Sequence, residues 1–216
     1  MKLKKERYNR AEIMFMKNVY DLRYEKDLLF ILPEDTRQTS GFTDLGVYRK
    51  SAVMIYLYYI DTLSVYYQYI DHIPQEIDLY VISSREDVLN EVHKHVAAVS
   101  ERNAYYICKE NRGRDVSALL IAGRAIVAKY EYVCFLHDKK EHCEEWREDT
   151  QFWVENLWGN QIGTGTYIRN VLGLFENNCE LGILAPPEPT GKHFNTWYGY
   201  GWYHSFEITQ DVARRL

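Results

Sequence analysis

Apolar runs of strand length alternate with amphipathic stretches of helix length along most of this chain. The apolar runs lie at 52–61, 76–84, 104–108, 130–136 and 180–189. A strand that is apolar on both faces is typical of a parallel sheet with helices packed on each side. The pattern therefore predicts an α/β protein, with a three-layer α/β/α fold and a mostly parallel central sheet.

Apolar residues spaced three and four positions apart predict helices between these strands. The predicted helices lie at 11–24, 62–73, 86–100, 116–127, 144–157 and 166–177, with another starting near Thr209. Trp158 should follow the end of the helix at 144–157. The last helix stops at Leu216, so either the chain continues past this end or the fold lacks its last elements. We interpret 1–50 as a lead-in of helix and loop, and 51–216 as the main domain.

Two polar turns follow the third and fourth strands. The first is NRGRD, Asn111 to Asp115, and the second is HDKK, His137 to Lys140. Parallel strands end at the same edge of a sheet, and ligands of open α/β sheets bind outside that carboxyl edge. Both turns should therefore face one ligand site, and Asp61 should lie at the same edge because it ends the first strand.

The NRGRD turn has the chemistry of an anion site. Asn111 and Gly113 both tolerate positive φ and so permit a tight turn from strand to helix. Asp115 is expected to cap that helix, beside the guanidinium groups of Arg112 and Arg114. Two such groups suit phosphate oxygens, as in a nucleoside diphosphate.

The HDKK turn offers one carboxylate, Asp138, among cationic side chains. Asp138 and an imidazole could hold Mg²⁺ or Mn²⁺, or the lysines could neutralise a diphosphate without a metal. Successive residues at a strand end point in alternate directions, so His137 and Lys139 should face the ligand together. Lys140 should then point away, towards the acids of the following helix. A zinc site is a weaker alternative, because Cys134 should point into the sheet; its ligands would be Cys134, His137, His142 and Cys143.

Composition narrows the class of protein. The net charge of −5 argues against general nucleic-acid binding, and no Gly-rich phosphate loop follows the first strand, which counts against NAD and ATP enzymes. The first residues are charged, with no apolar core after them, and no apolar run is long enough to cross a bilayer. The four cysteines form no C-x-x-C pair, and a reduced, cytoplasmic protein is expected. The aromatic segment with Trp197 and Trp202 is suited to stacking on sugars or bases.

Four motifs in order give the chain a family resemblance. ENRGRDVSALL, YVCFLHDKKEH, EEWREDTQFWVENLWGN and LGLFENNCELGILAPPEP together resemble the rhamnan synthesis protein F family over roughly 51–205. The resemblance implies a GT-A-like nucleotide-diphospho-sugar fold, truncated here at its C-terminus. It also implies transfer of a sugar, L-rhamnose from dTDP-L-rhamnose, onto a cell-surface polysaccharide such as a rhamnan, an O-antigen or a cell-wall glycan.

The residues at the motif positions are assigned on this resemblance. His137 and Asp138 are the expected catalytic residues, with Asp138 as the metal ligand if Mg²⁺ or Mn²⁺ is used. The donor diphosphate is assigned to Asn111, Arg112, Gly113, Arg114, Asp115, Lys139 and Lys140. The acceptor side is assigned to Asp61, Glu145, Trp146, Arg147, Trp197 and Trp202.

The expected partners are a nucleotide-diphospho-sugar and a glycan or lipid-linked glycan at the inner face of the membrane. The alternative is a non-catalytic module that binds nucleotide sugar or glycan within a larger assembly protein.

Overall fold

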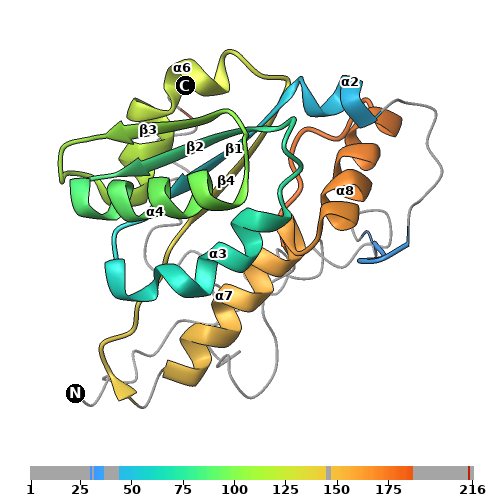
Figure 1. The fold of residues 1–216 in the computed structure, drawn as a ribbon. Helices are drawn as coiled ribbons and strands as arrows, with labels where there is room; N and C mark the ends of the chain where they lie inside the picture. Colours follow the sequence, from blue (N-terminus) through green and yellow to red (C-terminus); the bar gives the residue numbers. More distant parts are fainter. Residues whose placement is uncertain (1–29, 31, 37–43, 145–146, 187–213, 215–216) are drawn as a thin grey trace. The chain divides into compact units, whose positions relative to one another are not determined.

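The computed structural model of the chain describes residues 30, 32–36, 44–144, 147–186 and 214, and all the elements below lie in one compact unit, Leu32–Pro189. The described sheet has four parallel strands in the order β3-β2-β1-β4 (Figure 1). The strands are β1 Ser51–Tyr56, β2 Asp78–Ser83, β3 Ala104–Cys108 and β4 Tyr132–His137. The predicted α/β class and parallel sheet are confirmed.

Helices cover both faces of this sheet. They are α2 Asp44–Tyr48, η2 Ile60–Thr62, α3 Leu63–His72, α4 Glu86–Val99, α5 Arg114–Ser117, η3 Ala118–Ala122, α6 Arg124–Val127, α7 Arg147–Ile162 and α8 Gly165–Asn177. Helices α3, α4, α7 and α8 pack on one face, whereas the run from α5 to α6 packs on the other (Figure 1). Three layers result, as the sequence pattern predicts.

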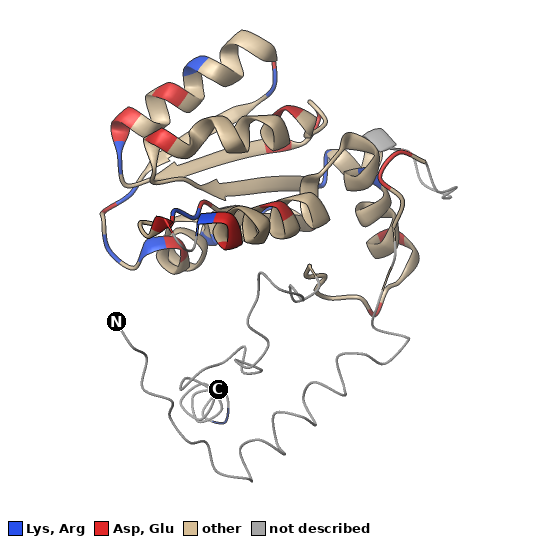
Figure 2. Ribbon diagram, turned by 90° about the horizontal axis from the view of Figure 1, so that it is seen from below, with Lys and Arg blue, Asp and Glu red and all other residues tan. Residues whose placement is uncertain are grey.

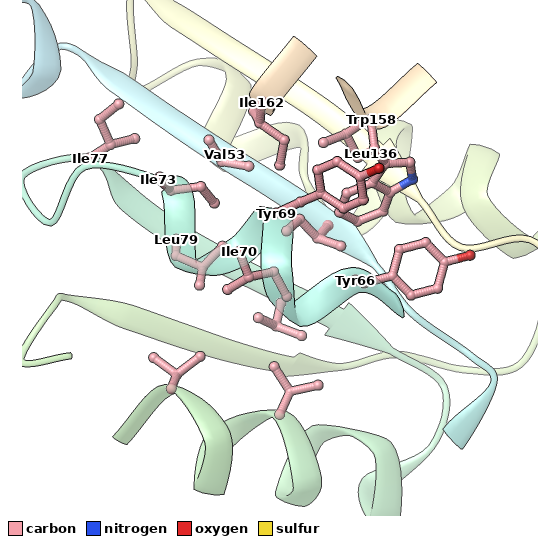
Figure 3. Packing of buried hydrophobic residues seen from close by; sticks show 14 of the residues in the cluster. Val53, Tyr66, Tyr69, Ile70, Ile73, Ile77, Leu79, Leu136, Trp158 and Ile162 are labelled. Atoms are coloured by element: carbon pink, nitrogen blue, oxygen red, sulfur yellow. The ribbon is translucent and has the colours of Figure 1, made fainter. Parts of the chain in front are cut away.

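The larger core lies beneath α3 and α7 (Figure 3). Trp158 is completely buried there, and its ring centroid lies 4.6 Å from that of Tyr66. The expectation that Trp158 follows the end of its helix is wrong, because α7 continues to Ile162. Burial of the large indole against α3 favours continuing the helix through this position.

The opposite face has a smaller core with a close approach at Gly123. A Cβ atom at Gly123 would lie 2.1 Å from Met54 Cε, so a side chain there would displace the end of the Met54 side chain in this core. Ala118 and Ile126 are buried beneath this run. Val116 is one of the apolar residues whose spacing predicted the helix at 116–127, yet it is 59% exposed, so that spacing only partly marks the buried face.

Two predicted strands differ from the observed structure. Strand β1 ends at Tyr56, so Asp61 lies five positions beyond it, in η2. The described part of the fifth predicted strand, 180–186, forms no strand, and Ile183 is 86% exposed. The predicted helix at 11–24 and the aromatic segment at 197–203 lie outside the described residues.

The strands that precede the two polar turns are not neighbours. Strands β3 and β4 lie on opposite sides of the described sheet, with β2 and β1 between them. All four strands are parallel, so their carboxyl ends still lie at one edge. Among the residues that the structure describes, no helix is both long and apolar enough to span a membrane.

Candidate functional site

Lys, Arg, Asp and Glu lie on the helices and loops and are nearly absent from the sheet (Figure 2). Apart from Asp78, the four described strands contain no Lys, Arg, Asp or Glu. The segments that follow their carboxyl ends are 57–59 after β1, 84–85 after β2, 109–115 after β3 and 138–140 after β4. We define these four segments, together with His137, as the carboxyl-edge site.

The NRGRD turn is stabilised by residues just outside it. Gly113 has φ of 72° and Arg114 has φ of 48°, so both adopt the left-handed conformation that a tight turn needs. Lys109 Nζ donates to the carbonyl of Arg112 at 3.1 Å, and Ser117 Oγ donates to that of Arg114 at 3.0 Å. The turn therefore has two side-chain supports that the sequence pattern did not reveal.

Asp115 is not the cap of the helix that follows the turn. Gly113 occupies the cap position of α5 and Asp115 lies in its first turn, so that prediction is wrong. Asp115 is thereby left partly exposed on the site side. The guanidinium groups of Arg112 and Arg114 are exposed, and neither forms an ion pair within the described part of the chain.

His137 meets Asp115 across the sheet edge. Its Nε2 lies 3.9 Å from Asp115 Oδ2, so the two polar turns do come together. Its Nδ1 lies 2.8 Å from the carbonyl oxygen of Asp138, which can only accept, so Nδ1 bears the proton. When the imidazole is neutral, Nε2 is therefore the unprotonated nitrogen, on the side where Asp115 lies.

The two lysines of HDKK have different surroundings. Lys139 Nζ lies 5.9 Å from the centroid of the Trp153 ring, and the His137 ring lies 5.7 Å from the same ring. His137 and Lys139 thus share one side, as strand alternation predicts.

Lys140 instead forms an ion pair with Asp61, whose pKa is lowered by the hydrogen bond from that lysine. The expectation that Lys140 points to the acids of the following helix is wrong.

Asp138 is turned into the protein. The residue is 6% exposed, and its Oδ2 accepts from the backbone N–H groups of Tyr58 at 2.7 Å and Tyr59 at 2.8 Å. Burial raises the pKa of its carboxyl, while these two hydrogen bonds oppose the rise. The described residues contain no group of three His, Cys, Asp or Glu able to hold a metal ion. Asp138 therefore does not fit the metal-ligand role.

Further side chains complete the site, and sequence reasoning missed them. Tyr58 OH accepts from Asn111 Nδ2 at 3.4 Å, and the Arg85 guanidinium lies 5.8 Å from the Tyr58 ring centroid. Lys109 Nζ lies 5.1 Å from the centroid of Tyr56. Each of these residues lies within a few positions of a strand end, which is the one signal that could have identified them.

The remaining candidates are more distant or undescribed. Arg147, the first residue of α7, is exposed and pairs with Glu144 at 2.5 Å. Glu145, Trp146, Trp197 and Trp202 lie outside the described residues. Cys134 donates to Gln161 Oε1 at 3.2 Å, and burial raises the pKa of its thiol to about 12. The described residues contain no group of three His, Cys, Asp or Glu able to hold a metal ion, so the predicted zinc ligands do not come together.

The fold and site define an α/β protein with a cationic, aromatic-lined surface at the carboxyl edge of a parallel sheet. The chain belongs to the rhamnan synthesis protein F family, whose model matches residues 3–216. That match extends beyond the motifs at 51–205 to almost the whole chain, and it supports a role in rhamnan synthesis. Neither the curated proteins nor the solved structures contain a match to this chain.

Proposed function

We propose that this protein is a glycosyltransferase of the GT-A type that moves L-rhamnose from dTDP-L-rhamnose onto a cell-surface polysaccharide. Family membership supports a part in rhamnan synthesis. The observation that supports a single reaction site is the 3.9 Å approach of His137 to Asp115, which brings the NRGRD and HDKK turns together. The acceptor is a glycan or lipid-linked glycan, met at the cytoplasmic face of the membrane.

The donor diphosphate is assigned to the cations of the carboxyl-edge site. Arg112 and Arg114 are exposed and outside any ion pair among the described residues, so an anion can take their hydrogen bonds. Lys139 lies beside the Trp153 ring and forms no ion pair among the described residues, which leaves its charge available to a ligand. Fixed positive charges of this kind stabilise negative charge as it develops on a leaving diphosphate.

His137 is the group best placed to accept the acceptor's proton. In this proposal the acceptor hydroxyl oxygen bonds to the anomeric carbon as the bond from that carbon to the diphosphate breaks. The hydroxyl proton passes to Nε2 of His137, and Asp115 stabilises the imidazolium. Asp138 cannot take this role from its present position, because its Oδ2 already accepts two backbone hydrogen bonds.

Thermal unfolding with a panel of nucleotides tests donor binding. The panel contains dTDP, UDP, GDP and dTDP-L-rhamnose, each with and without Mn²⁺. A ligand at 100 times its dissociation constant adds about 2.7 kcal/mol to the free energy of unfolding. The double variant Arg112→Ala/Arg114→Ala should lose the shift, while Arg124→Ala, at an exposed arginine of α6, should keep it. No shift of the parent with any nucleotide would refute the donor site.

A further inference from the structure

Asp138 connects the HDKK turn to the loop after β1, because it is bonded to Tyr58 and Tyr59, which lie 80 and 79 positions earlier in the sequence. Its backbone N–H donates to the Tyr56 carbonyl at 3.0 Å, continuing the β1–β4 ladder by one residue. Its side chain then accepts from the backbone of Tyr58 and Tyr59, the second and third residues after β1. One residue thus holds both the end of β1 and the loop beyond it.

The loop held by Asp138 reaches the segments that follow the other three strands. Tyr58 contacts Asn111 and Arg85, which follow β3 and β2. The Tyr59 ring centroid lies 5.8 Å from Lys140 Nζ, and Lys140 pairs with Asp61 of η2. The position of this loop therefore fixes the spacing among the side chains of the carboxyl-edge site.

The main chain of HDKK is held from its other side as well. Trp158 Nε1 donates to the His137 carbonyl at 3.2 Å. Tyr66 OH accepts from Lys139 N at 2.8 Å and donates to Lys139 O at 3.1 Å. With the chain fixed at His137 and Lys139, the carboxylate between them has little freedom to turn towards a ligand.

We infer that Asp138 is a positioning residue. Its hydrogen bonds hold the loop after β1 against the HDKK turn, and it contacts neither a metal ion nor the donor. The inference goes beyond the proposed function, although its effect on transfer rests on that function. A buried carboxylate with two backbone donors satisfies polar groups that would otherwise be costly to bury. The cationic side chains around Asp138, rather than Asp138 itself, then bind the diphosphate.

Two substitutions distinguish a positioning role of Asp138 from a role as metal ligand or base. Asp138→Asn keeps an oxygen that can accept from Tyr58 and Tyr59 but removes the negative charge, whereas Asp138→Ala removes the acceptor. Amide hydrogen exchange is measured first on the nucleotide-free full chain. In the alanine variant the Tyr58 and Tyr59 amides should exchange about 10- to 100-fold faster, the factor expected when a hydrogen bond to a charged group is lost. In the asparagine variant they should stay protected.

Donor binding and transfer are then compared in the same proteins. The asparagine variant should retain the parent's kcat and its response to Mn²⁺, and the alanine variant should show a raised KM for the donor. Asp78→Asn is the matched control, since Asp78 is a partly buried acid at the opposite end of the sheet that accepts from Tyr130.

Rapid exchange of the Tyr58 and Tyr59 amides in the parent would contradict the positioning role of Asp138. Loss of transfer in Asp138→Asn with both amides still protected would contradict it too. The negative charge of the Asp138 carboxylate would then act on the ligand rather than on the loop. Exchange needs no donor, so a parent that fails to transfer sugar counts against the proposed function alone.

Discussion

His137 Nε2 lies 3.9 Å from Asp115 Oδ2, although the strands that lead to these residues lie on opposite sides of the described sheet. The helical run from α5 to α6 leaves β3, crosses the face of the sheet and returns the chain to β4. The first turn of α5 thereby places Asp115 over the end of β4. This contact joins the two polar turns into one site.

Asp115→Asn should slow transfer without weakening donor binding. The change removes the negative charge that stabilises a protonated His137 but leaves the donor cations unaltered. A positioned base contributes roughly 10²- to 10⁴-fold, and loss of its carboxylate partner should remove part of that factor from kcat. Steady-state kinetics would measure the change, with Asp71→Asn as control because Asp71 pairs with His95 on α4. A raised donor KM with unchanged kcat would instead place Asp115 among the binding residues.

The two lysines of HDKK should differ in their effect on donor binding. Lys139→Ala removes a cation that forms no ion pair among the described residues, and should cost about 1.5–3 kcal/mol of donor binding. Lys140→Ala breaks an exposed ion pair with Asp61 and should leave donor binding almost unchanged. Calorimetric titration of both variants with dTDP would compare them directly. Equal, small losses would restrict the diphosphate site to the arginines.

Tyr66→Phe should destabilise the protein and loosen the HDKK turn. Tyr66 is 1% exposed, and its hydroxyl is hydrogen-bonded to both N and O of Lys139. Removing the hydroxyl leaves these backbone groups without that partner, at a cost of about 1–3 kcal/mol in the free energy of unfolding. Urea unfolding would measure the loss. Tyr69→Phe is the control, because the Tyr69 hydroxyl in the same cluster forms no hydrogen bond to any described residue. Similar losses in both variants would argue that the hydroxyl contacts of Tyr66 are unimportant.

Asp138→Asn should alter how the free energy of unfolding depends on pH. Burial raises the pKa of the Asp138 carboxyl, so the folded protein binds this proton more tightly than the unfolded chain does. The parent therefore gains stability as pH falls through the raised pKa, and the gain is complete below the ordinary value of about 3.9. Asparagine has no such proton. Urea unfolding between pH 7 and about pH 4 should show the free energy of unfolding of the parent rising relative to that of the variant as pH falls. A difference between the two that does not change with pH would contradict the raised pKa.

Local sequence patterns predicted the bounds of a strand and of a helix closely. The run 104–108 became β3 with the predicted bounds, and 86–100 became α4 with one residue fewer. The run 180–189 has the same apolar character, yet its described part pairs with no strand, because pairing depends on a partner edge that local sequence does not encode.

The site was predictable in its location but not in its contacts. Parallel strands place NRGRD and HDKK at one edge, and this required only the strand pattern. The inward turn of Asp138 depends on the Tyr58 and Tyr59 amides, about eighty positions away, so no local pattern could reveal it. The Lys140 prediction failed because its partner, Asp61, lies in η2, 79 positions away, where no local pattern could indicate it.

Transfer of labelled rhamnose from dTDP-L-rhamnose to a polysaccharide acceptor tests the central claim most directly. The full chain should release dTDP and label the acceptor in equal amounts. His137→Gln should lower the rate by about 10²- to 10⁴-fold while it still binds dTDP. Donor binding by the parent with no labelled acceptor and no dTDP released would contradict the account and indicate a non-catalytic binding module.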